Sequence, residues 1–461
     1  MYSIFVLLKV LSKFHLAGAL MKKIVIEQSS KAFYTAQSGL VLVGELVNGS
    51  TSLCERLDKR VPGRPRISHS DVVKTYLGLL CQGKSDFEAA AGLAGDDWFR
   101  EALGIQNVPS QETLRQRFDR HAQAFERIID ESITELLKRR KISVTPTSTG
   151  HVALDLDVFC LDNSDTKKEG VSRTYQGYDG YAPIGAYLGE EGWCLGLELR
   201  EGSQHGQNGF VPFLSKVLAR ARQLEARPIL VRTDSAHDAL ENLVELSRHA
   251  DVDFVIGWNP RKADKDSWWE RACREGRITE PRAGKKVAVF STSVERTHQG
   301  RRYRFRLVVR VTERLCDAKG QMLVQPDIDL EGWWTSLDLE DLDVIAIYEK
   351  RGLSEQFHSE IKSDLDLERL PSGKFATNAL VLTLGGFAYN LLRLVGQSGL
   401  MGEGSPVRHP AKRRRIKTVI QELISVAARV IRTARRVKLQ FGRHCPVFDA
   451  FRSVYLKFCP G

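Results

Sequence analysis

Hydrophobic residues recur every three or four positions in the first third of the chain, the spacing of helices that bury one face. Candidate helices start after Ser85 and Ser110, residue types that cap helix N-termini, and a third is SHSDVVKTYLGLLCQG. We therefore predict a helical region over residues 1–147 and assign it to DNA binding as a hypothesis. Compact helices joined by short turns are typical of helix-turn-helix DNA readers, although a plain bundle has the same pattern.

Residues 148–257 change to alternating strand patterns separated by helical ones. Three strands come first, in HVALDLDVF, RTYQGYDGYAPIGAYLG and GWCLGLELR. Helix, strand, helix and strand follow, in NGFVPFLSKVLARARQLEA, RPILVRTD, SAHDALENLVELSRHA and VDFVIGW. This order predicts an α/β core on a mixed sheet whose parallel part lies in the middle.

Residues 258–340 interrupt this pattern with long alternating stretches, above all KKVAVFSTSVERTHQGRRYRFRLVVRVTERL. We predict a β-rich insertion, in which Trp333 and Trp334 either belong to the core or stack against a displaced base. The α/β core resumes over 341–370. The apolar stretch FATNALVLTLGGFAYNLLRLVG then opens a helical region over 371–461.

Length and composition narrow the class of protein. A chain of 461 residues exceeds one ordinary core, so several domains are expected. Its net charge of +11 favours a polyanionic partner such as nucleic acid. The eight cysteines form no C-x-x-C pair, which argues against a zinc site and is typical of a reducing, cytoplasmic compartment.

The first twenty residues are apolar but are interrupted by Lys9 and Lys13. The run is therefore too short and too charged to cross a bilayer, and no membrane association is expected. A second methionine follows at Met21. One interpretation is that the functional chain starts there, which would leave residues 1–20 as upstream sequence.

The segment 408–443 carries twelve lysines and arginines against a single glutamate. Its apolar positions predict a docked helix with a charged outer face. Such dense positive charge favours contact with DNA phosphates, and the strongest candidates are Lys412, Arg413, Arg414 and Arg415. A solvated surface is the alternative.

Carboxylates stand where strands are expected to end. Asp155 and Asp157 project from the same side of the first strand, because side chains alternate along a strand. Asp234 closes the strand PILVRTD, and sites in open α/β sheets form at the carboxyl ends of strands. We expect these acids to meet Glu355, which comes from a later helix.

That helix is predicted over IYEKRGLSEQFHSEIKSDL, residues 347–365. At about 100° per residue, Arg351, Glu355 and Lys362 all lie within about 60° of Tyr348. Helices that only pack show an apolar stripe, so this polar one indicates a function, with a chance stripe as the alternative. Arg351 and Lys362 could hold a DNA phosphate, and Tyr348 could bind a phosphate or stack on a base.

Three carboxylates that gather at one place repel one another unless a cation compensates. Oxygen ligands of this kind suit Mg²⁺ or Mn²⁺. Two such ions about 4 Å apart activate an attacking oxygen and stabilise a leaving oxygen at phosphorus. We therefore expect Asp157, with Asp155 as its alternative, to bind two divalent ions together with Asp234 and Glu355.

The spacing Tyr348-x2-Arg351-x3-Glu355-x6-Lys362 resembles the Y-x2-R-x3-E-x6-K signature of a branch of the DDE transposases of bacterial insertion sequences. The LDLD and RTDSAHD motifs and the long β insertion also agree with that family, over residues 150–370.

This resemblance implies a core similar to RNase H and retroviral integrase. The catalytic acids would be Asp157 on the first strand, Asp234 after the fourth strand and Glu355 on a later helix. The family usually has a small residue and a threonine after its first aspartate. Here valine and phenylalanine follow Asp157, so Asp155 stays an alternative.

The resemblance also implies the reaction and its partners. Metal-dependent cleavage at the terminal inverted repeats of an insertion sequence would precede strand transfer into target DNA. A homodimer on double-stranded DNA, acting at the bacterial nucleoid in the cytoplasm, would carry it out. A nuclease of the same fold without strand joining and a non-catalytic DNA-binding protein are the alternatives.

Overall fold

The computed structural model describes residues 26, 33–261, 263–317, 319–402 and 404–459. The chain divides into two units, Met1–Tyr34 and Thr35–Gly461, and strand β1 (Tyr34–Thr35) falls at their boundary. The sheet, the helices and the cavities described below belong to the second unit. The interpretation of residues 1–20 lies outside the described residues.

Helices make up most of the described chain between residues 40 and 139. Its helices are α2 (Leu40–Ser50), α3 (Leu53–Arg60), α4 (His69–Leu80), the 3₁₀ helix η2 (Phe87–Leu93), α5 (Asp97–Leu103) and α6 (Gln111–Arg139). The predicted cap Ser110 accepts a hydrogen bond from the backbone N–H of Thr113 at the start of α6. Ser85 caps no helix, because its hydroxyl donates to Asp366 Oδ2 at 3.1 Å.

A mixed sheet forms the α/β core and confirms the predicted class. Its strands are β2 (Val152–Val158), β6 (Ile184–Leu188), β7 (Trp193–Glu198), β8 (Ile229–Thr233) and β9 (Val252–Gly257). They lie in the order β7-β6-β2-β8-β9, in which β2, β8 and β9 are parallel and β6 is antiparallel to both neighbours. The parallel strands are almost fully buried, as strands covered on both faces must be. A small separate sheet contains β3 (Leu161–Asp162), β4 (Ser172–Arg173) and β5 (Asp179–Tyr181).

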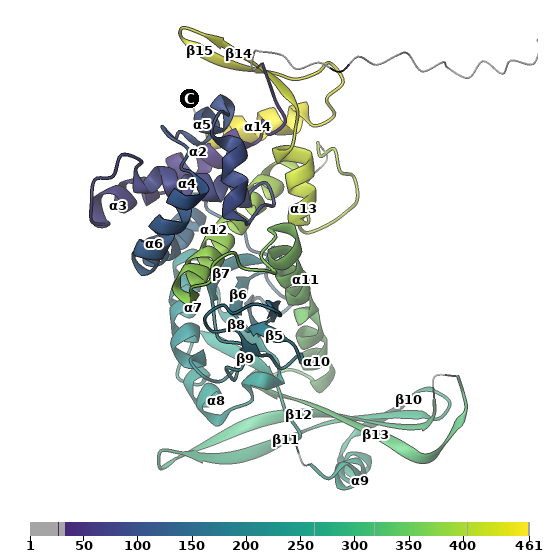
Figure 1. The fold of residues 1–461 in the computed structure, drawn as a ribbon. Coiled ribbons are helices and arrows are strands. Elements are labelled where there is room, and N and C mark those ends of the chain that lie inside the picture. The colour runs from purple at the N-terminus through teal and green to yellow at the C-terminus, as the bar shows by residue number, and fades with distance from the viewer. Residues whose placement is uncertain (1–25, 27–32, 262, 318, 403, 460–461) are drawn as a thin grey trace, which may run out of the picture. The chain divides into compact units, whose positions relative to one another are not determined.

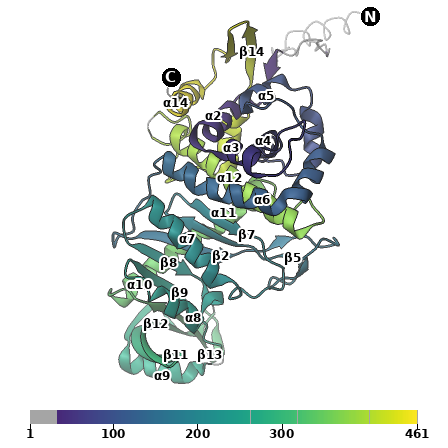
Figure 2. The same cartoon turned by 90° about the vertical axis from the view of Figure 1, so that its left-hand side faces the viewer.

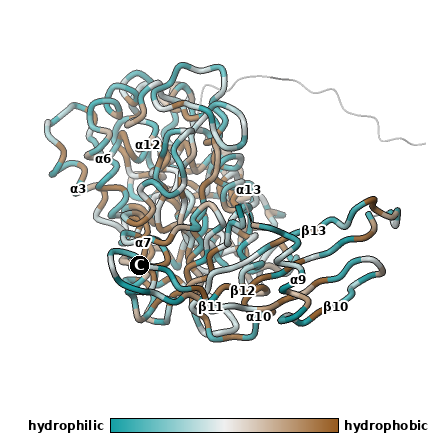
Figure 3. Tube along the Cα trace, turned by 90° about the horizontal axis from the view of Figure 1, so that it is seen from below, coloured by the Kyte–Doolittle hydropathy of each residue, from teal (hydrophilic) through white to brown (hydrophobic). Residues whose placement is uncertain are grey.

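The insertion continues the same sheet. It contains α9 (Lys265–Glu275), β10 (Arg277–Arg282), β11 (Lys285–His298), β12 (Arg301–Cys316) and β13 (Met322–Thr335). Strand β13 pairs with β9, which extends the sheet to nine strands within the described residues. These long strands lie below the core helices at the bottom of Figure 1 and run out to the right in the hydropathy trace of Figure 3. Trp333 and Trp334 are each 3% exposed, so both belong to the core of this sheet.

Helices cover both faces of the core sheet (Figures 1 and 2). Those after its strands are α7 (Phe210–Leu224), the 3₁₀ turn η3 (Ser235–His237), α8 (Leu240–Leu246) and α10 (Asp341–Glu349). The predicted apolar helix is α12 (Phe375–Gly399), which packs against α6 and β7. It is long and apolar enough to span a bilayer, but 94% of its apolar window is buried inside the protein. Its sequence is therefore that of a core helix.

The helix predicted over residues 347–365 is divided into four parts. Helix α10 gives way to a 3₁₀ turn η4 (Lys350–Gly352), then to α11 (Leu353–Ser359) and the π-helix η5 (Glu360–Asp364). Glycine costs a helix interior about 1 kcal/mol relative to alanine, and the first break ends at Gly352. The prediction of one regular helix was therefore wrong.

The basic segment after α12 is also not one helix. It contains α13 (Ile416–Val419), the π-helix η6 (Ile420–Ile424), β14 (Ala428–Thr433) and β15 (Arg436–Gln440), before the last helix α14 (Phe448–Phe458). Strands β14 and β15 form an antiparallel hairpin. Three of the six residues in ARVIRT are β-branched, Val430, Ile431 and Thr433, and such residues favour a strand over a helix. The prediction of a helical C-terminal region is corrected accordingly.

Candidate active site

Three acids from distant parts of the sequence line one cavity of about 620 Å³. Asp157 lies near the end of β2, Asp234 directly follows β8, and Glu355 lies on α11. Because β2 and β8 are neighbouring parallel strands, their carboxyl ends meet at the same edge of the sheet. The structure thus brings together the acids that the sequence singled out.

Asp157 is held by a cation. Arg351 Nη2 lies 2.9 Å from Asp157 Oδ1, and both side chains are mostly buried. Within the described residues, neither Nε nor Nη2 of Arg351 has a hydrogen-bond partner of good geometry. Burial raises the pKa of Asp157 to about 7; the charge of Arg351 opposes this shift and that of Asp234 adds to it. Arg351 therefore retains donor capacity that an entering anion could use.

Asp234 has a different environment, although it lines the same cavity. Its Oδ1 accepts hydrogen bonds from Ala236 N at 3.2 Å and from His237 Nδ1 at 2.9 Å. Burial alone would raise the pKa of Asp234, but the His237 hydrogen bond and nearby positive charge outweigh it and lower the pKa. One aspartate of the pair is thus stabilised in its charged form and the other is not.

Asp155 does not line this cavity. Both of its oxygens accept hydrogen bonds from Arg232 of β8, from Nε and Nη2, each at 2.7 Å. Arg232 also donates Nη1 to the backbone oxygen of Ile347 at 2.8 Å. This buried pair ties β2 to β8 and to α10, which gives Asp155 a structural position.

The remaining members of the predicted stripe separate into two groups. Glu355 is exposed to the cavity, and Lys362 lines it while donating Nζ to Cys160 O at 2.9 Å. Tyr348 does not line the cavity; its ring lies 5.8 Å from that of Trp333, and desolvation raises its pKa. A side chain at Gly257 would come within 3.0 Å of the Tyr348 hydroxyl, so this close approach requires glycine.

Sequence reasoning missed two kinds of cavity residue. His358 lines the cavity and stacks on Phe159, with ring centroids 4.3 Å apart. It follows Arg351 by seven residues, about 20° away on a helix, so the same counting would have found it. Tyr175 also lines the cavity and is 68% exposed, but it lies in a loop where no periodicity marks it.

His358 should make stability depend on pH. Burial lowers its pKa to about 3, helped by the charges of Arg351 and Lys362, whereas the ordinary value is 6.5. Between pH 3 and 6.5 the unfolded chain therefore binds a proton at His358 that the folded chain does not bind. The contribution of neutral, buried His358 to stability is complete above pH 6.5 and is lost as pH falls toward 3. We expect His358→Phe to remove a slope of up to about 1.4 kcal/mol per pH unit. Urea unfolding of both proteins between pH 4 and 7 measures it, and parallel curves would contradict the assignment.

The donor set of the cavity can be compared with what a metal ion requires. In the described part of the chain, no three His, Cys, Asp or Glu side chains converge closely enough to hold a metal ion as they stand. Asp157 faces Arg351 and Asp234 faces His237 instead. The donor set nevertheless fits Mg²⁺ in kind, because three carboxylates line one cavity.

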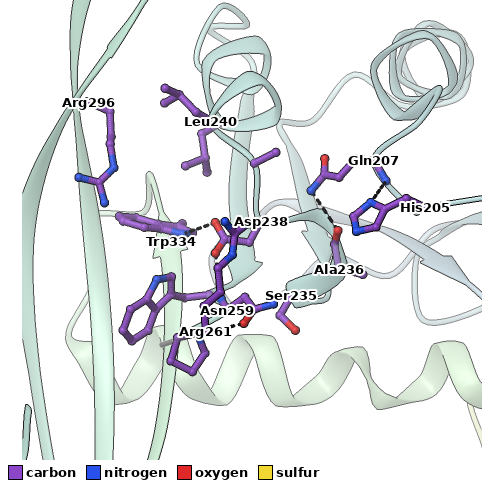
Figure 4. A pocket seen from close by; sticks show the side chains of 14 residues that line it. His205, Gln207, Ser235, Ala236, Asp238, Leu240, Asn259, Arg261, Arg296 and Trp334 are labelled. Atoms are coloured by element: carbon purple, nitrogen blue, oxygen red, sulfur yellow. Dashed lines mark hydrogen bonds between the residues drawn. The ribbon is translucent and has the colours of Figure 1, made fainter. Parts of the chain in front are cut away.

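A second cavity of about 590 Å³ is lined by Ser235, the residue after Asp234 (Figure 4). Trp334 forms part of its wall and donates Nε1 to Asp238 Oδ1 at 2.8 Å. Asp238 Oδ2 accepts from Asn259 N at 2.9 Å. Of the two tryptophans proposed for base stacking, Trp334 thus lines this cavity from a hydrogen-bonded core position, and Trp333 does not line it.

The four basic residues predicted to bind phosphate differ in exposure. Lys412 is exposed, whereas Arg413 and Arg414 are each only 9% exposed. The guanidinium of Arg414 donates to the backbone oxygens of Leu400 and Val407. Arg415 forms an ion pair with Asp364 at 2.9 Å. Arg413 and Arg414 therefore do not lie on a charged outer face, whereas Lys412 and Arg415 are exposed.

The chain combines an α/β fold, three carboxylates in one cavity and a net charge of +11. These are features expected of an enzyme that acts on phosphate esters. The chain belongs to the transposase DDE domain group 1 family, whose model matches residues 20–459. Among solved structures it is similar to a piggyBac transposase synaptic complex with hairpin DNA, at 9% identity and a TM-score of 0.42, covering 84% of this chain and 79% of that one. Comparison with curated proteins finds no match.

Proposed function

We propose that this transposase cuts double-stranded DNA at the ends of an insertion sequence and joins the released 3′ ends to target DNA. Asp157, Asp234 and Glu355 form its reaction centre. The observation that carries the proposal is that these three acids, 77 and 121 residues apart along the chain (234 − 157 and 355 − 234), line a single cavity. Asp157 rather than Asp155 is the first acid, because Arg232 occupies both oxygens of Asp155.

The strand order supports an RNase H-like core. In the order β7-β6-β2-β8-β9, the first three strands pair antiparallel, and β8 and β9 follow β2 in parallel. Asp157 lies on the central strand β2, and Asp234 follows the adjacent strand β8. The insertion then separates Asp234 from Glu355 in sequence but adds its strands at the far edge, beyond β9. The cavity at the strand ends therefore stays intact.

Asp157, Asp234 and Glu355 would hold divalent cations, Mg²⁺ or Mn²⁺ and two in number. Such ions would supply charge to the phosphate oxygens and lower the pKa of an attacking water. The chain's own contribution is to bring carboxylates from three segments to one place and to surround them with buried groups. Asp157 must release Arg351 to take this role, since the two are paired at 2.9 Å.

Arg351 and Lys362 would hold the DNA phosphate beside the acids. Both line the cavity, and Arg351 has buried donors without hydrogen-bond partners among the described residues. A phosphate diester would accept from them and draw Arg351 away from Asp157. Positioning and electrostatic stabilisation would then account for catalysis, without a covalent protein–DNA intermediate.

The spacing of Tyr348, Arg351, Glu355 and Lys362 supports membership in the bacterial insertion-sequence branch that has this signature. Reaction at two element ends favours a homodimer on the DNA. The partners would be the terminal inverted repeats and a target duplex, in the cytoplasm at the nucleoid.

The test is a set of reactions with Mg²⁺ and DNA from both flanks of the reading frame. Uncut flank DNA measures cleavage. Pre-cut DNA ends that carry a free 3′-hydroxyl measure joining to a target plasmid. A transposase is expected to do both. Cleavage without joining would indicate a nuclease, and binding without either reaction would indicate a DNA-binding protein; each result would overturn the proposal.

A further inference from the structure

Helix α11, which carries Glu355, depends on the rest of the chain for its position. It has seven residues between the 3₁₀ turn η4 and the π-helix η5, and isolated helices of this length are not stable. Glu355 itself is exposed, so its own side chain adds little packing. The groups that contact its neighbours must therefore fix where its carboxylate lies.

Arg413 makes three contacts around Glu355. Its Nη2 donates to Gln356 Oε1 at 2.7 Å, and its guanidinium lies 4.4 Å from the centre of the Phe357 ring. Its Nη1 donates to the backbone oxygen of Glu190, between β6 and β7, at 3.1 Å. The planar guanidinium of Arg413 thus joins the two residues after Glu355 to the turn between two strands of the core sheet. Arginine is suited to this position because its guanidinium can donate several hydrogen bonds and stack on an aromatic ring at the same time.

Two more arginines hold the following turns. Arg415 pairs with Asp364 and donates Nη2 to Ser359 Oγ at 3.2 Å. Arg393 of α12 forms a fully buried ion pair with Glu360 and also donates to the backbone oxygen of Arg414 at 2.6 Å. These contacts join η5 to α12 and to the segment before α13, which adjoins η5. Arg413 differs from them because it alone of the three contacts α11 beside the catalytic glutamate.

We propose that Arg413 is a positioning residue for Glu355: it holds α11 against the core sheet, so that part of the basic segment acts on the active site from inside the protein. The inference rests on the proposed function, since it assigns Arg413 an effect on the reaction through Glu355. It differs from the role expected from the sequence, in which Arg413 would contact DNA phosphate as its exposed neighbour Lys412 can.

The experiment compares full-length wild type with Arg413→Gln, Arg413→Lys and Lys412→Gln in three measurements. These are hydrogen exchange of the peptide covering 353–364, the cleavage rate at saturating DNA, and the salt dependence of DNA binding. For Arg413→Gln we expect exchange in 353–359 about tenfold faster, because a cation–π contact and hydrogen bonds are lost. Cleavage at saturation should fall about 10- to 100-fold, with an unchanged salt slope.

The two other variants are matched controls. Arg413→Lys keeps the charge but loses the planar fork, so we expect it to show most of the loss in cleavage rate. Lys412→Gln should lower the slope of log affinity against log salt by about 0.9 and leave exchange in 353–359 unchanged. Comparison of Arg413→Lys with Arg413→Gln therefore separates the effect of the charge at position 413 from that of the planar guanidinium.

Two results would overturn the proposal. If Arg413→Gln lowers the salt slope while cleavage at saturating DNA stays normal, Arg413 is a DNA contact. If it lowers only the thermal midpoint, with the saturated rate unchanged below that midpoint, its role is structural alone. Should Arg413→Gln fail to fold, Phe357→Leu removes the same cation–π contact at similar volume, and a normal saturated rate would overturn the proposal equally.

Failure of the proposed function gives a different result. If wild type cleaves DNA and Glu355→Gln cleaves equally well, the reaction centre is wrong, whatever exchange shows. If Glu355→Gln is inactive but Arg413→Gln has wild-type rate and exchange, only the positioning role is wrong.

Discussion

Glu355→Gln abolishes DNA cleavage and strand transfer on this account, by about 10³-fold or more, while DNA binding is kept. Glutamine preserves the size of the side chain but removes the charge that would face the metal ions and phosphate. Glu355 is exposed at the cavity, so the change should not disturb folding. The measurement is the single-turnover cleavage rate on flank DNA, with affinity measured separately in Ca²⁺.

A matched control is Glu349→Gln, six residues earlier. Glu349 ends α10 and pairs with Arg310 at 2.9 Å, outside the cavity. We expect it to cleave within about twofold of wild type, since surface ion pairs contribute about 0–1 kcal/mol. Equal losses in both variants would mean that Glu355 has no special position.

Asp155→Asn and Asp157→Asn should fail in opposite ways. Asp155→Asn removes the partner of the buried Arg232, and an uncompensated buried charge costs about 3–5 kcal/mol, so the protein should be strongly destabilised. Asp157→Asn should stay folded, because its partner Arg351 lies at a cavity that an anion or water can enter, but cleavage should be lost. Urea unfolding and single-turnover cleavage on both variants check this.

The opposite result would reverse the assignment of the two aspartates. A stable but inactive Asp155→Asn protein, together with active Asp157→Asn, would make Asp155 the first acid. Arg232→Gln offers an independent control, because it breaks the same buried pair and should destabilise the protein without changing any acid.

Strand periodicity predicted the core of the fold but could not choose between Asp155 and Asp157. The two side chains project from the same side of β2, so alternation treats them alike. The choice is made by Arg232, which is 77 residues away and reaches Asp155 only once β2 and β8 pair in their observed register. A partner across the sheet is not visible from local spacing.

The helical stripe was predicted with a regular geometry that the chain does not keep. Arg351, Glu355 and Lys362 still reach one cavity, because the 3₁₀ turn and the π-helix change the rotation of the chain in opposite senses. Tyr348 precedes both breaks, does not line the cavity, and is half-buried against Trp333 instead.

Charge density could not show which arginines of the chain are buried. A count of arginines does not distinguish those that face solvent from those that contact carbonyls and carboxylates of the same chain. Arg393 and Arg413 are buried because partners such as Glu360 and Gln356 come from another part of the sequence. Predicting them would require the tertiary contact first.

The most direct test of the central claim is anomalous diffraction from Mn²⁺ in crystals of the protein bound to its end DNA. The account predicts density for manganese bonded to carboxylate oxygens of Asp157, Asp234 and Glu355, with Arg351 moved from Asp157 to a phosphate. Manganese absent from this cavity while DNA occupies it, or manganese held by other residues, would contradict the account.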